Sequence, residues 1–183
     1  MRTGIIRIPT LKYLIALAIG SLLTASEPTA PSAPATEYRL RMFHTHTHER
    51  LDIVYRNGAG YMPDALTKLD RFLRDSITGE VHHFDPRLFD LLADLTKATS
   101  HPTTEIQIIC GYRTPSTNEY LRTHTVGVAK NSLHMQAEAI HIRLPDVKTS
   151  VVRQVALSMG RGGVGYYPTS NFVHVDVGRV RQW

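Results

Sequence analysis

The chain has 183 residues, of which 42% are hydrophobic and 20% are charged. That length suits one domain with a single core, and the composition excludes a disordered, collagen-like or coiled-coil protein. Three basic residues and no acidic residue precede position 27, so the rest of the chain carries 18 basic and 16 acidic residues. Such a small excess gives no reason to expect a nucleic-acid partner. A single cysteine also excludes an intrachain disulfide and a cysteine-rich zinc module.

Residues 1–26 have the layout of a secretory signal peptide. Arg2, Arg7 and Lys12 precede the uncharged run 13–23, and small residues follow at 24–26. A membrane-spanning helix needs about 20 apolar residues, so this shorter run predicts cleavage and no stable membrane anchor. The alternatives are an uncleaved anchor or a buried helix, although the Pro-rich linker at 27–37 disfavours a core helix. We therefore expect a domain at 38–183 that is periplasmic or secreted.

The mature chain mixes strand and helix patterns without regular alternation. The runs 39–43 and 51–56 predict a hairpin with a long loop. Helices are predicted from Pro63 and from Pro86, where Asp85 provides an N-cap. Further strands are predicted at 105–112, 138–144, 162–167 and 171–177, and further helices at 116–123 and 149–159. The expected fold class is α+β, with a small, mostly antiparallel sheet and flanking helices.

Histidines occupy the polar faces of two predicted strands. His174 and Asp176 alternate with apolar residues in the last strand, His141 does so in the strand at 138–144, and His134 lies seven residues earlier. If these strands are neighbours, three imidazoles can converge. Three imidazole nitrogens with an open fourth position form an established catalytic zinc site. The same spacing also fits surface histidines or histidines that are only hydrogen-bonded.

A second group of histidines lies in the predicted hairpin. His44, His46 and His48 recur at period two and would share one face of a strand. That pattern allows a second metal patch. We instead expect these residues to form the loop between the two strands.

Several segments carry a recognisable set of motifs. They are 111–113 (GYR), 132–141 (SLHMQAEAIH), 163–168 (GVGYYP) and 172–176 (FVHVD), with 45–47 (THT) and 71–75 (RFLRD) before them. Together they resemble the MepK-like (YcbK-like) murein endopeptidases. This family belongs to the zinc peptidase superfamily that includes D-Ala-D-Ala peptidases and the hedgehog domain. The resemblance extends from about Leu40 to Trp183 and implies a hedgehog/D-Ala-D-Ala peptidase-like fold.

The resemblance also implies a metal site. The family pattern S-x-H-x-x-G-x-A-x-D places His134 and, further on, His174 as ligands, while His141 stands where the family has its metal-binding Asp. The implied zinc ligands are therefore His134, His141 and His174. Three neutral imidazoles leave a bound zinc site at +2 rather than +1, and the alternative is that His141 displaces the ion and leaves an inactive fold. Ala137 replaces the family's Gly and would be strained at positive φ.

Two further residues have candidate roles, Asp176 from its place two residues after His174 on the same strand face and Arg113 from the resemblance. Asp176 can act as general base, or it can accept a hydrogen bond that orients a ligand imidazole. Arg113 is similar to the family's cleft arginine, which binds a substrate carboxylate or stabilises an oxyanion; the alternative is a surface ion pair. Cys110 stands where the family usually has Ser, and on an apolar strand we expect it to be a small buried residue rather than a nucleophile.

The function implied is that of an exported zinc metallopeptidase that hydrolyses peptide cross-links of peptidoglycan. Its partners would be peptidoglycan stem peptides, and the sequence identifies no accessory protein. The alternative function is a catalytically impaired murein-binding or scaffold protein of the same fold. Ala137 and His141 motivate that alternative, because both depart from the family pattern.

Overall fold

A computed structural model describes residues 36–58 and 60–183. The predicted signal peptide at 1–26 and nearly all of the predicted linker at 27–37 lie outside these residues. Within the described part of the chain, no helix combines the length and the apolar character needed to cross a membrane.

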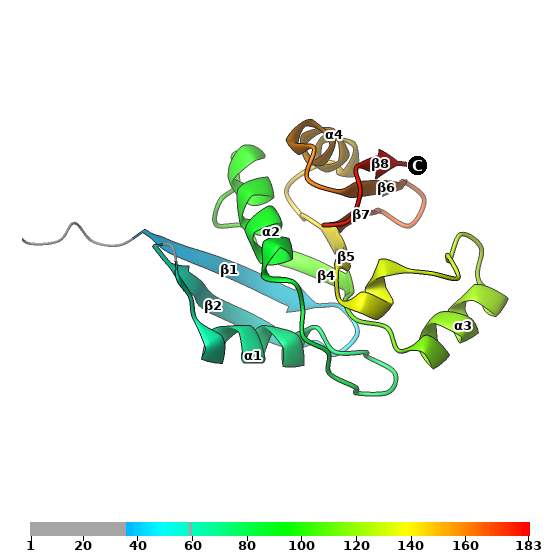
Figure 1. The fold of residues 1–183 in the computed structure, drawn as a ribbon. Coiled ribbons are helices and arrows are strands. Elements are labelled where there is room, and N and C mark those ends of the chain that lie inside the picture. The colour runs from blue at the N-terminus through cyan, green and yellow to red at the C-terminus, as the bar shows by residue number, and fades with distance from the viewer. Residues whose placement is uncertain (1–35, 59) are drawn as a thin grey trace, which may run out of the picture. The chain divides into compact units, whose positions relative to one another are not determined.

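A mixed sheet forms the centre of the described structure (Figure 1). Its eight strands follow the order β3-β2-β1-β4-β5-β7-β6-β8. The strands are β1 (Glu37–His44), β2 (Arg50–Asn57), β3 (Gly60–Tyr61), β4 (Ile106–Cys110), β5 (Ala139–Arg143), β6 (Gly163–Tyr167), β7 (Phe172–Asp176) and β8 (Arg181–Gln182). The pairs β1–β4 and β6–β8 are parallel and the other neighbours are antiparallel. The predicted α+β class is confirmed.

Local sequence signals explain where the helices begin. The helices are α1 (Pro63–Phe72), α2 (Pro86–Ala98), α3 (Pro115–His124) and α4 (Thr149–Met159). The first three have proline in the first turn, where a missing N–H costs no hydrogen bond. Asp85 accepts a hydrogen bond from the backbone of Arg87, and Thr114 accepts one from that of Thr117, so both cap their helices.

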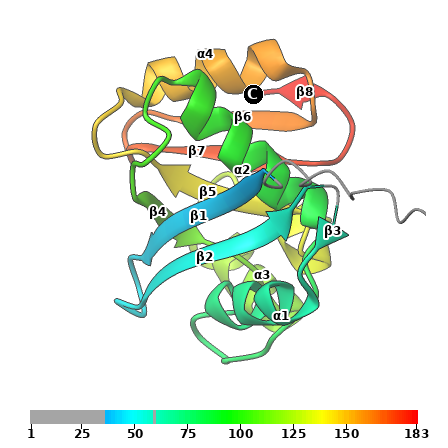
Figure 2. The same ribbon diagram turned by 90° about the vertical axis from the view of Figure 1, so that its left-hand side faces the viewer.

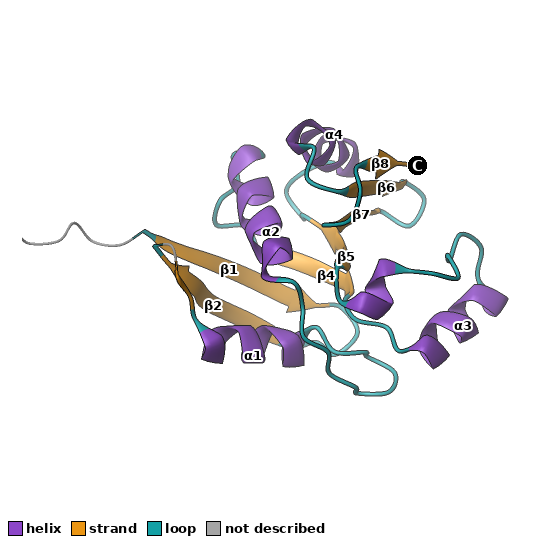
Figure 3. Cartoon of the chain, viewed as in Figure 1, coloured by secondary structure: helices purple, strands orange, loops and turns teal. Residues whose placement is uncertain are grey.

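The core lies between the sheet and three of the helices, and α1 packs on β2 with Ala65, Leu69 and Phe72 in the core. α2 packs on β1 and on α4, and α4 packs on β6 and β7, as Figure 2 shows from the side of α2. The apolar residues Ile140, Ile142, Val173 and Val175 are fully buried on this face. Because strand side chains alternate, the polar residues between them must lie on the opposite face. Figure 3 shows α3 standing away from the sheet.

The structure adds elements that the sequence patterns did not predict. β3 and β8 are two residues long, too short for a period-two pattern to identify. The segment before β5, which carries His134, contains a 3₁₀ helix, η1 (Leu133–Gln136). The hairpin formed by β1 and β2 is confirmed, and His44 ends its first strand.

Candidate metal centre

A row of side chains crosses the sheet on the face opposite the core. In the strand register, Cys110 of β4 pairs with His141 of β5, His141 pairs with His174 of β7, and His174 pairs with Gly165 of β6. His141 and His174 are therefore direct cross-strand neighbours. The structure thus brings together the two strand histidines that the sequence placed on polar faces.

An irregularity in β4 determines where Cys110 points. Ile108 pairs with Ile142, yet Cys110 pairs with the next residue, His141, so the register shifts at Ile109. A bulge of this kind re-aims the following side chain. Without it, Cys110 would share the core face of Ile108. The prediction of a small residue in an apolar strand missed this contact with the histidines.

His134 completes the cluster, although it lies in η1 and not in a strand of the sheet. Ser132 Oγ accepts a hydrogen bond from its backbone N–H at 3.4 Å. Its ring centroid is 4.4 Å from that of His141 and 5.1 Å from that of His174. η1 ends at Ala137, which is buried and has φ +52°. This left-handed conformation costs an alanine about 1 kcal/mol or more, so the strain considered for a positive φ is present.

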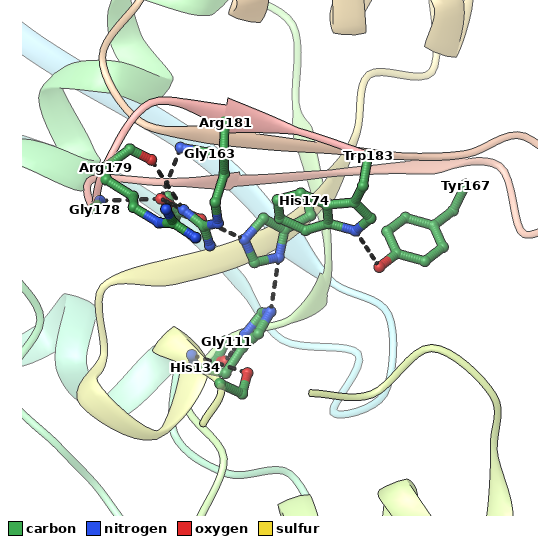
Figure 4. Close-up of polar contacts among 11 residues, drawn as sticks. Gly111, His134, Gly163, Tyr167, His174, Gly178, Arg179, Arg181 and Trp183 are labelled. Atoms are coloured by element: carbon green, nitrogen blue, oxygen red, sulfur yellow. Dashed lines mark hydrogen bonds and ion pairs between the residues drawn. The ribbon is translucent and has the colours of Figure 1, made fainter. Parts of the chain in front are cut away.

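Hydrogen bonds fix the tautomers of two rings. His134 Nδ1 lies 2.7 Å from the carbonyl oxygen of Gly111, and His174 Nε2 lies 2.8 Å from Asp176 Oδ2. Both oxygens can only accept, Asp176 being ionised, so both ring nitrogens donate. The remaining nitrogens, His134 Nε2 and His174 Nδ1, are 3.3 Å apart. Figure 4 shows the two rings meeting in this way.

The donor atoms fit a metal ion. Tetrahedral zinc with Zn–N bonds of about 2.0–2.1 Å holds its ligand nitrogens about 3.3–3.4 Å apart, which is the separation of His134 Nε2 and His174 Nδ1. In addition, donor atoms of Cys110, His134 and His141 lie within 4.8 Å of one another. Imidazole and thiol donors of this kind suggest a metal site.

The surroundings keep the imidazoles neutral. Burial is the main cause that lowers the pKa of His134, His141 and His174, and the positive charge of Arg113 lowers all three pKa values further. Only the neutral ring has a free nitrogen lone pair, so a low pKa favours metal coordination at neutral pH.

Asp176 is fully buried and bound on both oxygens. Oδ1 accepts hydrogen bonds from the backbone N–H groups of Gly163 and Gly178 at 2.8 and 3.0 Å. Arg181 donates to Oδ1 at 3.1 Å and to Oδ2 at 2.7 Å. Burial raises the pKa of Asp176, but hydrogen bonds from His174 and Arg181 outweigh it and hold that pKa below its usual value. The carboxylate is therefore ionised.

Arg113 lies inside the cluster rather than at the surface. Its Nε donates to Cys110 Sγ at 3.0 Å, and its terminal nitrogen Nη2 lies 3.5 Å from His141 Nδ1. The side chain is buried, and no ion pair involves it among the described residues. This position is inconsistent with a surface ion pair.

A cleft of about 530 Å³ opens onto the cluster. One wall is aromatic: Phe172 stacks on His141 with centroids 4.4 Å apart and on Tyr167 at 4.5 Å. Trp183 lies 5.0 Å from the His174 ring and donates to Tyr167 Oη at 2.9 Å, as Figure 4 shows. Sequence reasoning missed Trp183 and Arg181, because neither belongs to a spacing pattern that indicates a site.

The second histidine group has a structural role at His44. Its buried Nδ1 accepts hydrogen bonds from the backbone N–H groups of His46 and Thr47, both at 3.3 Å. His44 thus organises the turn that follows β1, as expected for a loop. Within the described residues, the group of closely spaced metal donors contains Cys110, His134 and His141 and none of these three histidines.

Known proteins are similar to this sequence over most of its length. The profile of the family described as "Peptidoglycan L,D-endopeptidase MepK" matches residues 32–183. The "Probable peptidoglycan L,D-endopeptidase MepK" of Haemophilus influenzae is 43% identical over 169 residues, which cover 92% of this chain and 90% of that protein. The "Peptidoglycan L,D-endopeptidase MepK" of Escherichia coli K12 is 39% identical over 177 residues, with 94% and 96% covered. The chain therefore belongs to the peptidoglycan L,D-endopeptidase MepK family.

Proposed function

We propose that this protein is a zinc metallopeptidase that hydrolyses peptide cross-links of peptidoglycan, of the L,D type named for its relatives. The observation that carries the proposal is the 3.3 Å separation of His134 Nε2 and His174 Nδ1 at the base of a cleft. Two neutral ring nitrogens that face each other at this distance suit a cation between them. Family membership makes peptidoglycan stem peptides the natural occupants of the cleft.

Three histidines would hold the metal: His134, His141 and His174. A zinc ion bound there would polarise the scissile carbonyl and lower the pKa of a water molecule toward neutrality. The protein's own contribution is to present neutral nitrogens from a rigid sheet and a short helix. The Gly111 carbonyl and the Asp176 carboxylate maintain the tautomers that make those nitrogens available.

Asp176 acts in this proposal as a positioning residue for His174. A general base needs a free oxygen near the attacking water, whereas both oxygens of Asp176 already accept hydrogen bonds from buried groups. The lowered pKa of Asp176 also makes it a weak proton acceptor. Of the two roles considered for Asp176, the orienting role is the one supported.

Arg113 is proposed to bind substrate. Its guanidinium lies among the residues that line the cleft, next to His141. Stem peptides carry free carboxylates, and a guanidinium can pair with a carboxylate or stabilise an oxyanion. Its burial places that charge where water screens it weakly.

Export forms part of the proposal because murein lies outside the cytoplasm. The charged start, apolar run 13–23 and small residues at 24–26 support cleavage near Ala25 or Ser26. The product would be periplasmic or secreted. N-terminal sequencing of protein recovered outside the cytoplasm tests this step, and an intact Met1 on a cytoplasmic product would contradict it.

The alternative remains a murein-binding scaffold without catalysis. His141 in place of a carboxylate and the strained Ala137 favour it, because both alter the metal site relative to the family pattern. The deciding experiment is digestion of isolated sacculi, with identification of the released muropeptides. We expect the zinc-loaded protein to hydrolyse L,D cross-links, so that muropeptides joined by them decline and uncross-linked muropeptides increase, and the His174→Ala variant to leave them intact. Binding to sacculi without any release by the zinc-loaded protein would favour the scaffold.

A further inference from the structure

The Cys110 thiol points into the cluster formed by His134, His141 and His174. Its sulfur is 3.0 Å from Arg113 Nε and 3.8 Å from His134 Nδ1, the ring nitrogen that donates to the Gly111 carbonyl. The register shift in β4 aligns it with His141. Its donor atom belongs, with those of His134 and His141, to the group that lies within 4.8 Å. The register shift thus places the thiol in the histidine cluster, and the thiol does not pack in the apolar core.

Among the residues that the structure describes, no unpaired carboxylate near the cluster could bind a metal. The three histidines are neutral donors, and the Arg113 guanidinium adds a positive charge at 3.5 Å from His141. Asp176 is ionised, but Arg181 contacts both of its oxygens. Asp75 also lines the cleft, yet its carboxylate accepts hydrogen bonds from Thr114 and from backbone groups of its own loop. A divalent ion would therefore meet neutral nitrogens and a guanidinium.

Cys110 can supply the missing negative charge. A thiol that coordinates zinc loses its proton, here to solvent, and binds as thiolate. The guanidinium of Arg113, already donating to the sulfur, would then stabilise that thiolate. The positive charge of Arg113, which would otherwise repel the metal ion, would then be balanced by the thiolate.

We propose that Cys110 Sγ is the anionic ligand of the metal, alongside His134 and His141. The inference rests on the proposed metallopeptidase and specifies its ligand set. In tetrahedral zinc, a sulfur and a nitrogen ligand lie about 3.6 Å apart and two nitrogen ligands about 3.3 Å apart. Donor atoms within 4.8 Å of one another therefore need to approach by about 1.2 Å and about 1.5 Å at most, respectively. With His174 also bound, substrate would use a fifth position, which catalytic zinc accepts during reaction.

Cobalt(II) provides a direct readout that does not depend on activity. The metal-free protein is titrated with Co²⁺ and its near-ultraviolet absorption is recorded. We expect an intense sulfur-to-cobalt charge-transfer band for the wild type. Cys110 is the sole cysteine of the chain, so the band has one source. X-ray absorption of the zinc form should show one Zn–S distance of about 2.3 Å.

Cys110→Ser is the matched control, because it retains the size of the side chain while removing the thiolate. We expect this variant to stay folded, to lose the band and to bind Co²⁺ at least about tenfold more weakly. Cys110→Ala provides the same test without a hydroxyl donor. Cobalt binding by the wild type without the band would overturn the thiolate ligand and leave the metallopeptidase proposal standing. Absence of metal binding by both wild type and Cys110→Ser would overturn both proposals.

Discussion

His134 Nε2 and His174 Nδ1 point at each other across 3.3 Å, each fixed by a hydrogen bond on the opposite side of its ring. Two lone pairs that face each other repel unless a proton or a metal ion lies between them. Their pKa values are lowered, so a proton is disfavoured. The pair is therefore better satisfied by a metal ion than by solvent.

The first prediction removes each of these rings. His134→Ala and His174→Ala should each weaken zinc binding by about 100-fold or more, because each would remove one of the proposed zinc ligands. The fold should persist, because the side chains of Ile140 in β5 and Val173 in β7 stay buried in the core in both variants. Metal analysis together with circular dichroism measures both properties. An unchanged zinc content in either folded variant would show that its ring is not a ligand.

The second prediction concerns His141. If its ring is a ligand, His141→Asp should still bind zinc, and His141→Ala should bind it more weakly. His141→Ala also removes the stack on Phe172. Isothermal titration of zinc into the metal-free proteins, with muropeptide release from sacculi, separates the cases. Tighter binding by His141→Ala than by the wild type would show that His141 obstructs the site.

The third prediction tests Asp176 as a positioning residue. Asp176→Asn keeps the shape of the side chain but removes the charge that holds His174 Nε2–H and Arg181. We expect zinc affinity to fall about 10–100-fold, the usual effect of removing a partner of a ligand imidazole. If Asp176 were instead the general base, turnover would collapse at an unchanged zinc affinity. Zinc titration combined with the activity of the fully loaded variant distinguishes these roles.

The fourth prediction is a pH dependence of stability from His44. Burial, with the charges of His46 and Arg74, lowers the pKa of His44 from 6.5 to about 4. Between these values the unfolded chain binds the extra proton, so the contribution of His44 to stability is complete above pH 6.5 and is lost as the pH falls to about 4. The difference corresponds to about 3 kcal/mol. Urea unfolding at several pH values measures it.

His44→Asn is the matched control for that measurement. Its amide oxygen can replace Nδ1 as acceptor of the His46 and Thr47 N–H groups, but it does not titrate. The variant should lose less stability than the wild type between pH 6.5 and 4. Parallel pH profiles of the two proteins would refute the role assigned to His44.

The fifth prediction places Trp183 against the sheet. A Cβ added at Gly165 would come within 2.6 Å of the Trp183 ring. Gly165→Ala should therefore displace the Trp183 ring from His174 and break the hydrogen bond from Trp183 to Tyr167. Trp183 is the sole tryptophan, and its fluorescence emission should move to longer wavelength. Gly60→Ala is the control, since its nearest contact would be an ordinary 3.7 Å. Identical emission in both variants would contradict this packing.

Local chemistry explains which parts of the fold could be predicted from the sequence. Pro63 and Pro86 mark helix starts because proline suits the first turn. The alternation of Ile140 with His141 identifies a strand and also its polar face. His134, His141 and His174 were therefore predicted as a group, and the structure places them together.

Long-range pairing explains what could not be predicted. That β4 lies next to β5, with a shifted register at Ile109, depends on tertiary contacts and decides that Cys110 meets His141. Arg181 reaches Asp176 because β8 adds to the sheet edge, although β8 is too short to leave a pattern. The positive φ of Ala137 likewise arises from the turn between η1 and β5.

The parallel pairing of β1 with β4 affects how the metal site assembles. It joins His44 to Ile108, and α1 and α2 lie between these two strands in the chain. Such long-range pairing forms slowly because the intervening chain loses its freedom first. Cys110 follows on the same strand, and His174 lies still later in the chain. Metal uptake at the proposed site therefore requires these long-range pairings, and its rate in a refolding chain would follow their formation.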